Sequence, residues 1–336
     1  MKLSVIIPVY NVGEYLSQCL DSVLSQDIDD MEIICIDDCS KDNSYNILLK
    51  YAQQDSRIKV YKNEQNIGVG YTRNKGLNVA TGEYVHFLDP DDWLENGAYH
   101  LITEKLNNKN LDILFVNYKK FDNETKEFRK IEFPNKDILD KILNPVKDAE
   151  VFDNWERMCW LKFIRRDFLT ENNITFPNYV SLSDVEWAAN TYVKAKTICY
   201  TDIVVVNYRV NRKNSLVKLA NNSILQIIGS VIKNRKLYVN FPDKIKYRML
   251  AADYILLTKG IPNAYKNGIL NIFELYKIIK IVNNDKNIKK YNFSFRDDYC
   301  CYQNLKFPIL DFKKVVVKTN FPELFYFIVQ IKKFLK

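Results

Sequence analysis

The sequence predicts an α/β protein with a mostly parallel sheet flanked by helices, followed by a mainly helical C-terminal region. In the front half, apolar runs of strand length alternate with stretches whose apolar residues recur at helical spacing. The connections between them are short, which is typical of a parallel sheet covered on both faces. From Ala220 onward the strand-like alternation gives way to helical spacing. At 336 residues the chain is long enough for two domains, and we place the boundary near residue 215.

The strands are predicted from apolar runs. Leu3–Val9 is almost continuously apolar, as expected of a strand buried on both faces. Further strands are predicted at 32–37, 58–61, 84–88, 113–116 and 203–208. Helices are predicted at 16–24, 45–52, 72–80 and 185–193. The polar stretch 122–136 reads as an excursion from the sheet.

Composition and charge narrow the class of protein. With 47% hydrophobic and 27% charged residues, the chain has the composition of a soluble globular protein. No targeting segment opens it, and no apolar stretch reaches the roughly 18 residues that span a bilayer, so we expect a cytoplasmic protein. The net charge of +8 is uneven, with 21 Lys and Arg against 8 Asp and Glu from Ala220 to Lys336. This surplus favours an anionic partner such as the inner face of the cytoplasmic membrane, whereas no motif supports nucleic-acid binding.

Cysteine and histidine argue against a zinc site. The seven cysteines form no CxxC pair, and Cys35 and Cys199 lie in apolar runs, which predicts buried reduced thiols. His86 and His100 are the only histidines, and His86 lies inside a predicted strand, which favours a packed core residue. A bound metal is therefore expected to be hard and held by oxygen atoms.

Polar residues gather where three predicted strands end, at 8–11, 37–40 and 89–92. Ligands of open parallel sheets bind beyond the carboxyl ends of the strands. Carboxylates that converge there are costly unless a cation or donors compensate them. The alternative is a set of turn formers and helix caps, for which Ser40, Asp42 and Asp92 are candidates.

The Asp-x-Asp at positions 89 and 91 suits one particular chemistry. Mg²⁺ or Mn²⁺ held by one or two carboxylates neutralises the charge of a departing diphosphate. Pro90 stiffens the loop between the two carboxylates. Taken alone, an Asp-x-Asp is a weak signal.

A family resemblance covers this part of the chain. The segments SVIIPVYN, EIICIDDCSKDNS, NIGVGYTRNKGL and ATGEYVHFLDPDDW lie in order within residues 3–93. Together they resemble the family 2 glycosyltransferases with the GT-A fold, common in bacterial surface-polysaccharide synthesis. A looser likeness continues to about residue 215. The resemblance implies a nucleotide-sugar half at 1–117 and an acceptor half at 118–215, followed by the basic, mainly helical region 216–336.

The resemblance also implies roles for individual residues. Pro8, Val9, Tyr10 and Asn11 would form the wall beside the nucleotide base, with Tyr10 stacking on it. Asp38 would accept a hydrogen bond from the uracil imide. Asn66, Gly68 and Arg73 would close the base pocket and lie near the phosphates, although Arg73 could instead form a salt bridge with a nearby carboxylate. Asp89, next to Pro90, would contact the ribose, and Asp91 would be the principal ligand of Mn²⁺ or Mg²⁺.

The catalytic base is expected at the start of a helix near residue 184. Asp184 matches the Asp of the family's Glu-Asp pair, but Ser183 replaces the Glu, and Glu186 is the reserve candidate. The alternative is that Ser183 or Asp184 only caps the helix, with Glu186 in its first turn. Lys162 and Arg209 match family positions that could reach the diphosphate or the acceptor, or are solvated surface charges.

The expected activity is inverting transfer of a hexose or N-acetylhexosamine from a UDP-sugar to a glycan or lipid-linked acceptor in surface-polysaccharide synthesis. The alternative is a non-catalytic nucleotide-sugar-binding subunit of a polysaccharide assembly complex, an interpretation that Ser183 keeps open. A nucleotidyltransferase would need a Gly-rich basic loop after the first strand, where the sequence has 11–14 Asn-Val-Gly-Glu. Near the C-terminus, a helix at 321–329 followed by three lysines either lies on a membrane or docks on its own domain.

Overall fold

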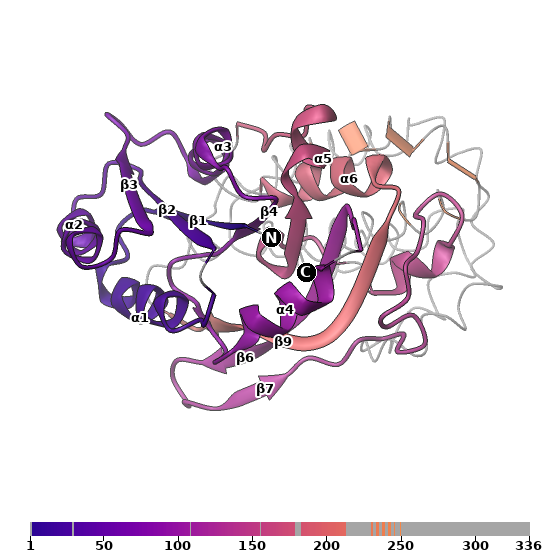
Figure 1. Cartoon of the computed structure of the whole chain (residues 1–336), viewed down its shortest axis with the longest axis horizontal. Coiled ribbons are helices and arrows are strands. Elements are labelled where there is room, and N and C mark those ends of the chain that lie inside the picture. The colour runs from indigo at the N-terminus through magenta and orange to yellow at the C-terminus, as the bar shows by residue number, and fades with distance from the viewer. Residues whose placement is uncertain are drawn as a thin grey trace, which may run out of the picture. The chain divides into compact units, whose positions relative to one another are not determined.

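The computed structural model describes residues 2–28, 30–107, 109–154, 156–178 and 183–212, with 230, 233–234, 237–238, 241–242, 245 and 249. Within these residues the strands form one nine-stranded sheet in the order β3-β2-β1-β4-β8-β6-β9-β5, with β7 paired to β6 (Figure 1). The sheet is mixed, and its N-terminal half is wholly parallel. The predicted α/β architecture is confirmed.

The parallel half carries the polar strand ends noted in the sequence. β1 (Leu3–Val9) lies between β2 (Met31–Asp37) and β4 (Tyr84–Phe87), and β3 (Ile58–Lys62) pairs with β2. Every residue of β1 and β2 is buried, which explains their continuous apolar character. The polar segments that follow β2, β1 and β4 therefore lie on adjacent strands at the same edge of the sheet.

The second half of the sheet departs from simple strand–helix alternation. β8 (Lys162–Arg165) is antiparallel to both β4 and β6 (Ile113–Asp122). β6 runs parallel to β9 (Ile198–Val210), and β5 (Trp93–Leu94) pairs antiparallel with β9. β7 (Phe128–Lys130) forms a hairpin with β6 inside the stretch predicted as an excursion. The end of the long β9 therefore lies beside the segment that follows β4.

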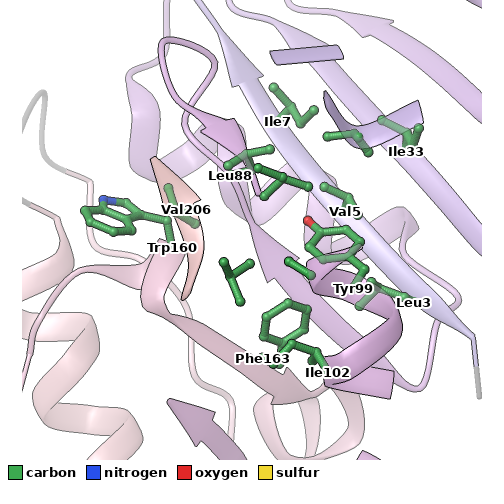
Figure 2. Close-up of a cluster of buried hydrophobic side chains, with 14 of the residues drawn as sticks. Leu3, Val5, Ile7, Ile33, Leu88, Tyr99, Ile102, Trp160, Phe163 and Val206 are labelled. Carbon is green, nitrogen blue, oxygen red and sulfur yellow. The ribbon is translucent and has the colours of Figure 1, made fainter. Parts of the chain in front are cut away.

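One face of the sheet is covered by α1 (Gly13–Leu24), α2 (Ser44–Gln54) and α4 (Ala98–Leu106) (Figure 1). Their apolar side chains pack on alternate residues of β1 and β2. Figure 2 shows part of this cluster, in which the Tyr99 and Phe163 rings meet edge to face with centroids 5.5 Å apart.

The opposite face is covered by α3 (Val69–Val79), α5 (Arg166–Glu171) and α6 (Asp184–Lys194). Two 3-10 helices, η1 (Ala149–Asn154) and η2 (Cys159–Leu161), contribute to the two apolar clusters. Because α3 and α6 share a face, the start of α6 is brought beside α3 although the two are far apart in sequence. This packing positions the candidate site.

The buried polar groups behave as the sequence suggested. Cys35 and Cys199 are buried free thiols, as predicted. His86 is fully buried, contacts the Tyr99 hydroxyl at 2.6 Å and the Trp160 carbonyl at 2.8 Å, and stacks on Phe163. Burial lowers the pKa of His86 to about 4, so it is a neutral core residue at physiological pH.

Beyond residue 215 the description is partial. Tyr238, Ile245 and Met249 are buried in the same apolar cluster as α6. The boundary near 215 stays a prediction, and the predicted helix at 321–329 lies outside the described residues. No helix in the part of the chain described here is both long and apolar enough to cross a membrane.

Candidate active site

The loops after β1 and β2 are tied to each other. Asn11, with φ at 50°, donates its N–H to Ser40 Oγ at 3.1 Å. Asp42 accepts from the main-chain N–H groups of Gly13 at 2.9 Å and Ser44 at 3.0 Å, which begin α1 and α2. The turn-and-cap interpretation is therefore correct for Asp42, while Ser40 links the two loops.

The expected base wall has one exposed ring. Pro8 and Val9 are buried at the end of β1, whereas the Tyr10 side chain that follows is 40% exposed. An exposed aromatic ring at a strand end is available for stacking on a planar ligand. The stacking role of Tyr10 stays a prediction.

Asp38 organises the loop that enters α3. Its Oδ1 accepts from Asn63 Nδ2 at 2.8 Å and from Ile67 N at 2.9 Å, and its Oδ2 accepts from Gly68 N at 2.9 Å. Gly68 has φ 87° and ψ 154°, a conformation open essentially to glycine alone. Asn66 also accepts from Gly68 N, at 3.2 Å. A carboxylate has about four acceptor positions, so Asp38 retains about one for a ligand.

Arg73 joins two carboxylates that come from distant parts of the chain. Its Nη2 lies 2.7 Å from Asp89 Oδ1 and its Nη1 lies 2.8 Å from Asp184 Oδ1, while the guanidinium carbon stands 5.2 Å from the Phe176 ring centre. Burial alone would lower the pKa of Arg73, but Cys159, Asp184 and Asp89 together outweigh it and raise that pKa above its ordinary value. The salt-bridge alternative is thus present with two carboxylates, and a nucleotide role for Arg73 stays a prediction.

Asp89 is under opposing influences. Burial raises the pKa of this carboxyl, Arg73 lowers it, and the negative charges of Asp91 and Asp184 raise it again, with a net upward shift. The Asp89 side chain is nevertheless 25% exposed, so it borders the open edge of the site.

Asp184 begins α6 and is held from two sides. Besides its pair with Arg73, its Oδ2 accepts from the Cys159 main-chain N–H at 3.1 Å. Ser183 stands at the N-cap position of α6 but makes no side-chain cap bond, and its buried Oγ has no partner among the described residues. The cap interpretation therefore holds for the position of Ser183 and not for its hydroxyl. Glu186 pairs instead with Lys233, at 3.1 Å.

The segment after Asp89 is clamped by β9. The Asp92 Oδ1 accepts from Arg209 N at 2.8 Å, and Arg209 Nε donates to the Asp91 carbonyl at 2.9 Å. Because α4 starts only at Ala98, the predicted capping role of Asp92 is wrong. Burial, together with the charges of Asp91 and Asp89, raises the pKa of Asp92 well above its ordinary value.

Each nitrogen of the Arg209 guanidinium donates a hydrogen bond. Nη1 donates to Asn123 at 3.0 Å, Nη2 donates to Gln18 at 2.7 Å, and the group stands 4.6 Å from the Trp93 ring centre and 4.8 Å from that of Tyr15. With the residue only 7% exposed, the surface-charge alternative is wrong. The guanidinium holds the loop around Asp91, and a diphosphate contact stays a prediction.

Lys162 is a core residue. It is 0% exposed, and its Nζ donates to the Glu156 carbonyl at 3.0 Å and also to the Met158 carbonyl. Burial lowers the pKa of Lys162 to about 8. The surface-charge alternative is wrong here as well, and the ammonium faces the loop that leads to Cys159 rather than solvent.

Arg212 is a site residue that the sequence analysis did not find. Its Nε forms an ion pair with Asp91 Oδ2, and the two side chains are 13% and 14% exposed. Arg212 lies two residues beyond β9, and only the pairing of β9 with β5 brings it to the loop after β4. No sequence pattern marked it.

These contacts define a carboxylate cluster made of Asp89, Asp91, Asp92 and Asp184. Arg73 and Arg212 form ion pairs with three of these carboxylates, and the Arg209 charge acts on Asp92 and Asp91 from nearby. Among the described residues, no group of three or more His, Cys, Asp or Glu could hold a metal ion. Mg²⁺ and Mn²⁺ sites that work on phosphates commonly use one or two carboxylates plus the substrate. Asp91 and the partly exposed Asp89 fit that smaller donor set.

Comparison with known sequences gives a consistent assignment. The model of the family described as Glycosyl transferase family 2 matches residues 4–169. The uncharacterized glycosyltransferase YibD of Escherichia coli is 30% identical over 252 residues, which cover 73% of each chain. The putative glycosyltransferase EpsH of Bacillus subtilis is 26% identical over 292 residues, covering 83% of this chain and 82% of that protein.

Solved structures share the fold. S. aureus TarS 1–349 in complex with UDP-GlcNAc superposes with a TM-score of 0.63 at 24% identity, over 76% of this chain and 72% of that one. The mannosyltransferase PcManGT from Pyrobaculum calidifontis, in complex with GDP-Man and Mn²⁺, gives a TM-score of 0.57 at 16% identity, over 90% and 84%. These similarities confirm the expected GT-A-like fold.

Proposed function

Because the chain belongs to glycosyltransferase family 2, we propose that it is an inverting transferase that moves a hexose or N-acetylhexosamine from a UDP-sugar to a glycan or lipid-linked acceptor in surface-polysaccharide synthesis. One observation carries this proposal. Arg73 joins Asp89, in the loop expected to face the donor, to Asp184, at the helix start expected to face the acceptor. A displacement reaction needs both groups fixed on opposite sides of one reacting carbon.

Asp184 is the proposed catalytic base. Each of its oxygens accepts one hydrogen bond in the structure, so each retains a lone pair for an acceptor hydroxyl. The carboxylate takes the hydroxyl proton while the acceptor oxygen attacks the anomeric carbon. The bond from that carbon to the diphosphate breaks on the opposite face, which inverts its configuration.

The proposed nucleotide site lies at the ends of β1 and β2. Tyr10 stacks on the base, and the remaining acceptor position of Asp38 receives the uracil imide N–H. Asn66 and Gly68 shape the loop that closes over the base, and Asp89 beside Pro90 meets the ribose. The support for these roles is the exposure of Tyr10 and the loop geometry fixed by Asp38.

Asp91, with Asp89 beside it, is the proposed holder of Mn²⁺ or Mg²⁺. When bound there, the cation offsets the negative charge that develops on the departing diphosphate. The chain's own contribution is to fix the loop, because Arg209 anchors the Asp91 carbonyl and the Asp92 carboxylate. PcManGT, a fold neighbour, was solved with Mn²⁺ and GDP-Man.

The test is a donor-hydrolysis and transfer screen of the purified protein with Mn²⁺. The panel contains UDP-, GDP- and dTDP-sugars, since fold neighbours were solved with UDP-GlcNAc and with GDP-Man. We expect nucleotide release from a UDP-hexose or UDP-N-acetylhexosamine, and no release by Asp184→Asn. Release only from GDP- or dTDP-sugars would contradict the donor assignment. UDP binding without hydrolysis or transfer, with lipid-linked glycans supplied, would favour the binding-subunit alternative.

A further inference from the structure

The carboxylate expected to hold a divalent cation already has a cationic partner. Arg212 Nε contacts Asp91 Oδ2, and both side chains are mostly shielded from water. An ion pair in such a position is screened much less than one on the open surface. The Arg212 guanidinium therefore occupies one side of the Asp91 carboxylate, and a divalent cation would need that carboxylate as a ligand.

The backbone at Asp91 has little freedom to move away from Arg212. Arg209 Nε holds the Asp91 carbonyl at 2.9 Å, and its main-chain N–H holds Asp92 at 2.8 Å. Arg209 itself is fixed by Asn123 and Gln18. The side chains of Asp91 and Arg212 are therefore the groups that can exchange partners without disturbing the loop.

The charge balance of the cluster indicates when Asp91 would exchange Arg212 for a divalent cation. The carboxylate cluster holds four carboxylates and three guanidiniums: Arg73 and Arg212 form ion pairs with Asp89, Asp184 and Asp91, and the Arg209 charge acts on Asp92 and Asp91. Without a donor the cluster is thus close to neutral, and a divalent cation would add excess positive charge. A diphosphate brings about two negative charges, which a divalent cation balances while the phosphate oxygens complete its ligand set.

We propose that Arg212 competes with the divalent cation for Asp91, holding that carboxylate in the donor-free protein and leaving it for the diphosphate when the nucleotide sugar binds. This inference rests on the proposed function. It makes Arg212 a positioning residue that couples cation binding to donor binding. Because such coupling is reciprocal, the nucleotide strengthens cation binding by the factor by which the cation strengthens nucleotide binding.

The experiment measures Mn²⁺ binding directly, from the loss of the free Mn²⁺ signal in electron paramagnetic resonance, with and without UDP. Arg212→Gln removes the competing charge, and Arg212→Lys retains it. Arg166→Gln is the matched control, because it removes a comparable charge from a partly exposed pair with Asp167, at 3.0 Å, that is separate from the carboxylate cluster. Asp91→Asn removes the proposed ligand. Thermal unfolding of each variant checks that it is folded.

We expect the wild type to bind Mn²⁺ weakly alone and more tightly with UDP. Arg212→Gln should bind Mn²⁺ without UDP about tenfold more tightly than the wild type, a typical coupling factor, and this difference should shrink with UDP. Arg212→Lys and Arg166→Gln should stay near the wild type, and Asp91→Asn should lose Mn²⁺ binding.

Two results would overturn the inference. If folded Arg212→Gln binds Mn²⁺ without UDP no more tightly than the wild type, Arg212 does not compete for Asp91. If no protein binds Mn²⁺ even with UDP, the cation site itself is wrong. Donor hydrolysis by the wild type is measured separately, so either result can be distinguished from failure of the proposed function.

Discussion

Arg73 and Asp184 stand 111 positions apart in the sequence, yet Nη1 of the arginine lies 2.8 Å from Oδ1 of the aspartate. The pair joins α3 to the first residue of α6 on one face of the sheet. The Asp184 carboxylate is therefore set by two elements at once, because the Cys159 N–H holds its other oxygen. These two contacts favour one orientation of the carboxylate, which the proposed role of Asp184 as general base requires.

Asp184→Asn should separate catalysis from binding. The amide can still accept from the Cys159 N–H, but it cannot take a proton from the acceptor. We expect turnover to fall by about 10²–10⁴-fold, with UDP affinity within about threefold of the wild type. Transfer kinetics and UDP calorimetry measure the two quantities. Equal loss of UDP affinity would instead assign Asp184 a structural role.

Arg209→Lys should loosen the loop around Asp91. Lysine keeps the charge but cannot reach Gln18, Asn123 and the Asp91 carbonyl together, so buried acceptors lose their donors. We expect the free energy of unfolding in urea to fall by about 2–4 kcal/mol. Arg129→Lys, at an exposed position of β7, is the control and should change it by less than about 0.5 kcal/mol. If Arg209→Lys unfolds at the same urea concentration as the wild type, the Arg209 hydrogen bonds do not stabilise the loop around Asp91.

Lys162→Met should change how stability depends on pH. Burial lowers the pKa of Lys162 from 10.5 to about 8, so between these values the unfolded chain binds a proton that the folded chain does not. The free energy of unfolding of the wild type should therefore gain about 3 kcal/mol from this group as pH rises from 8 to 10.5. Urea unfolding across that range should show the gain in the wild type and in the exposed control Lys50→Met, but not in Lys162→Met. If the free energy of unfolding depends on pH in the same way in all three proteins, the lowered pKa of Lys162 is contradicted.

Glu32→Gln should act at acid pH. The Glu32 side chain is 4% exposed; burial raises its pKa, but bonds from Lys59, Ser4 and Thr81 outweigh that and lower the pKa from 4.5 to about 2. Its stabilisation of about 3 kcal/mol is thus complete above pH 4.5 and is lost as pH falls towards 2. The advantage of the wild type over Glu32→Gln should vanish in the same window. An advantage that does not change between pH 5 and pH 2.5 would contradict this; exposed Glu83→Gln serves as the control.

Much of the fold was predictable because local chemistry specified it. The apolar run Leu3–Val9 and the helical spacing of 16–24 each predict an element from the residues of that segment alone, and both elements are buried in the core as expected. β8 and β5 were missed, since they are four and two residues long and are defined by antiparallel partners rather than by their own pattern.

The candidate site divides in the same way. The polar strand ends and Asp184 stood out in the sequence, because their residue types and order match a known pattern. The sequence did not show whether each charged side chain is buried or which partner it bonds. From the sequence, Lys162 and Arg209 could contact the diphosphate or the acceptor, or could be solvated surface charges; in the structure both are buried and bonded.

The sequence by itself determined the α/β class, the family resemblance and the strand ends that carry the candidate site, because those follow from periodicity and motif order. Only the tertiary structure decided which charges meet: Arg73 with Asp89 and Asp184, and Arg212 with Asp91. Two of these pairs join segments more than a hundred residues apart, and the third joins α3 to the loop after β4. Their partners are selected by packing and by the cost of leaving a buried charge alone, neither of which a linear pattern records.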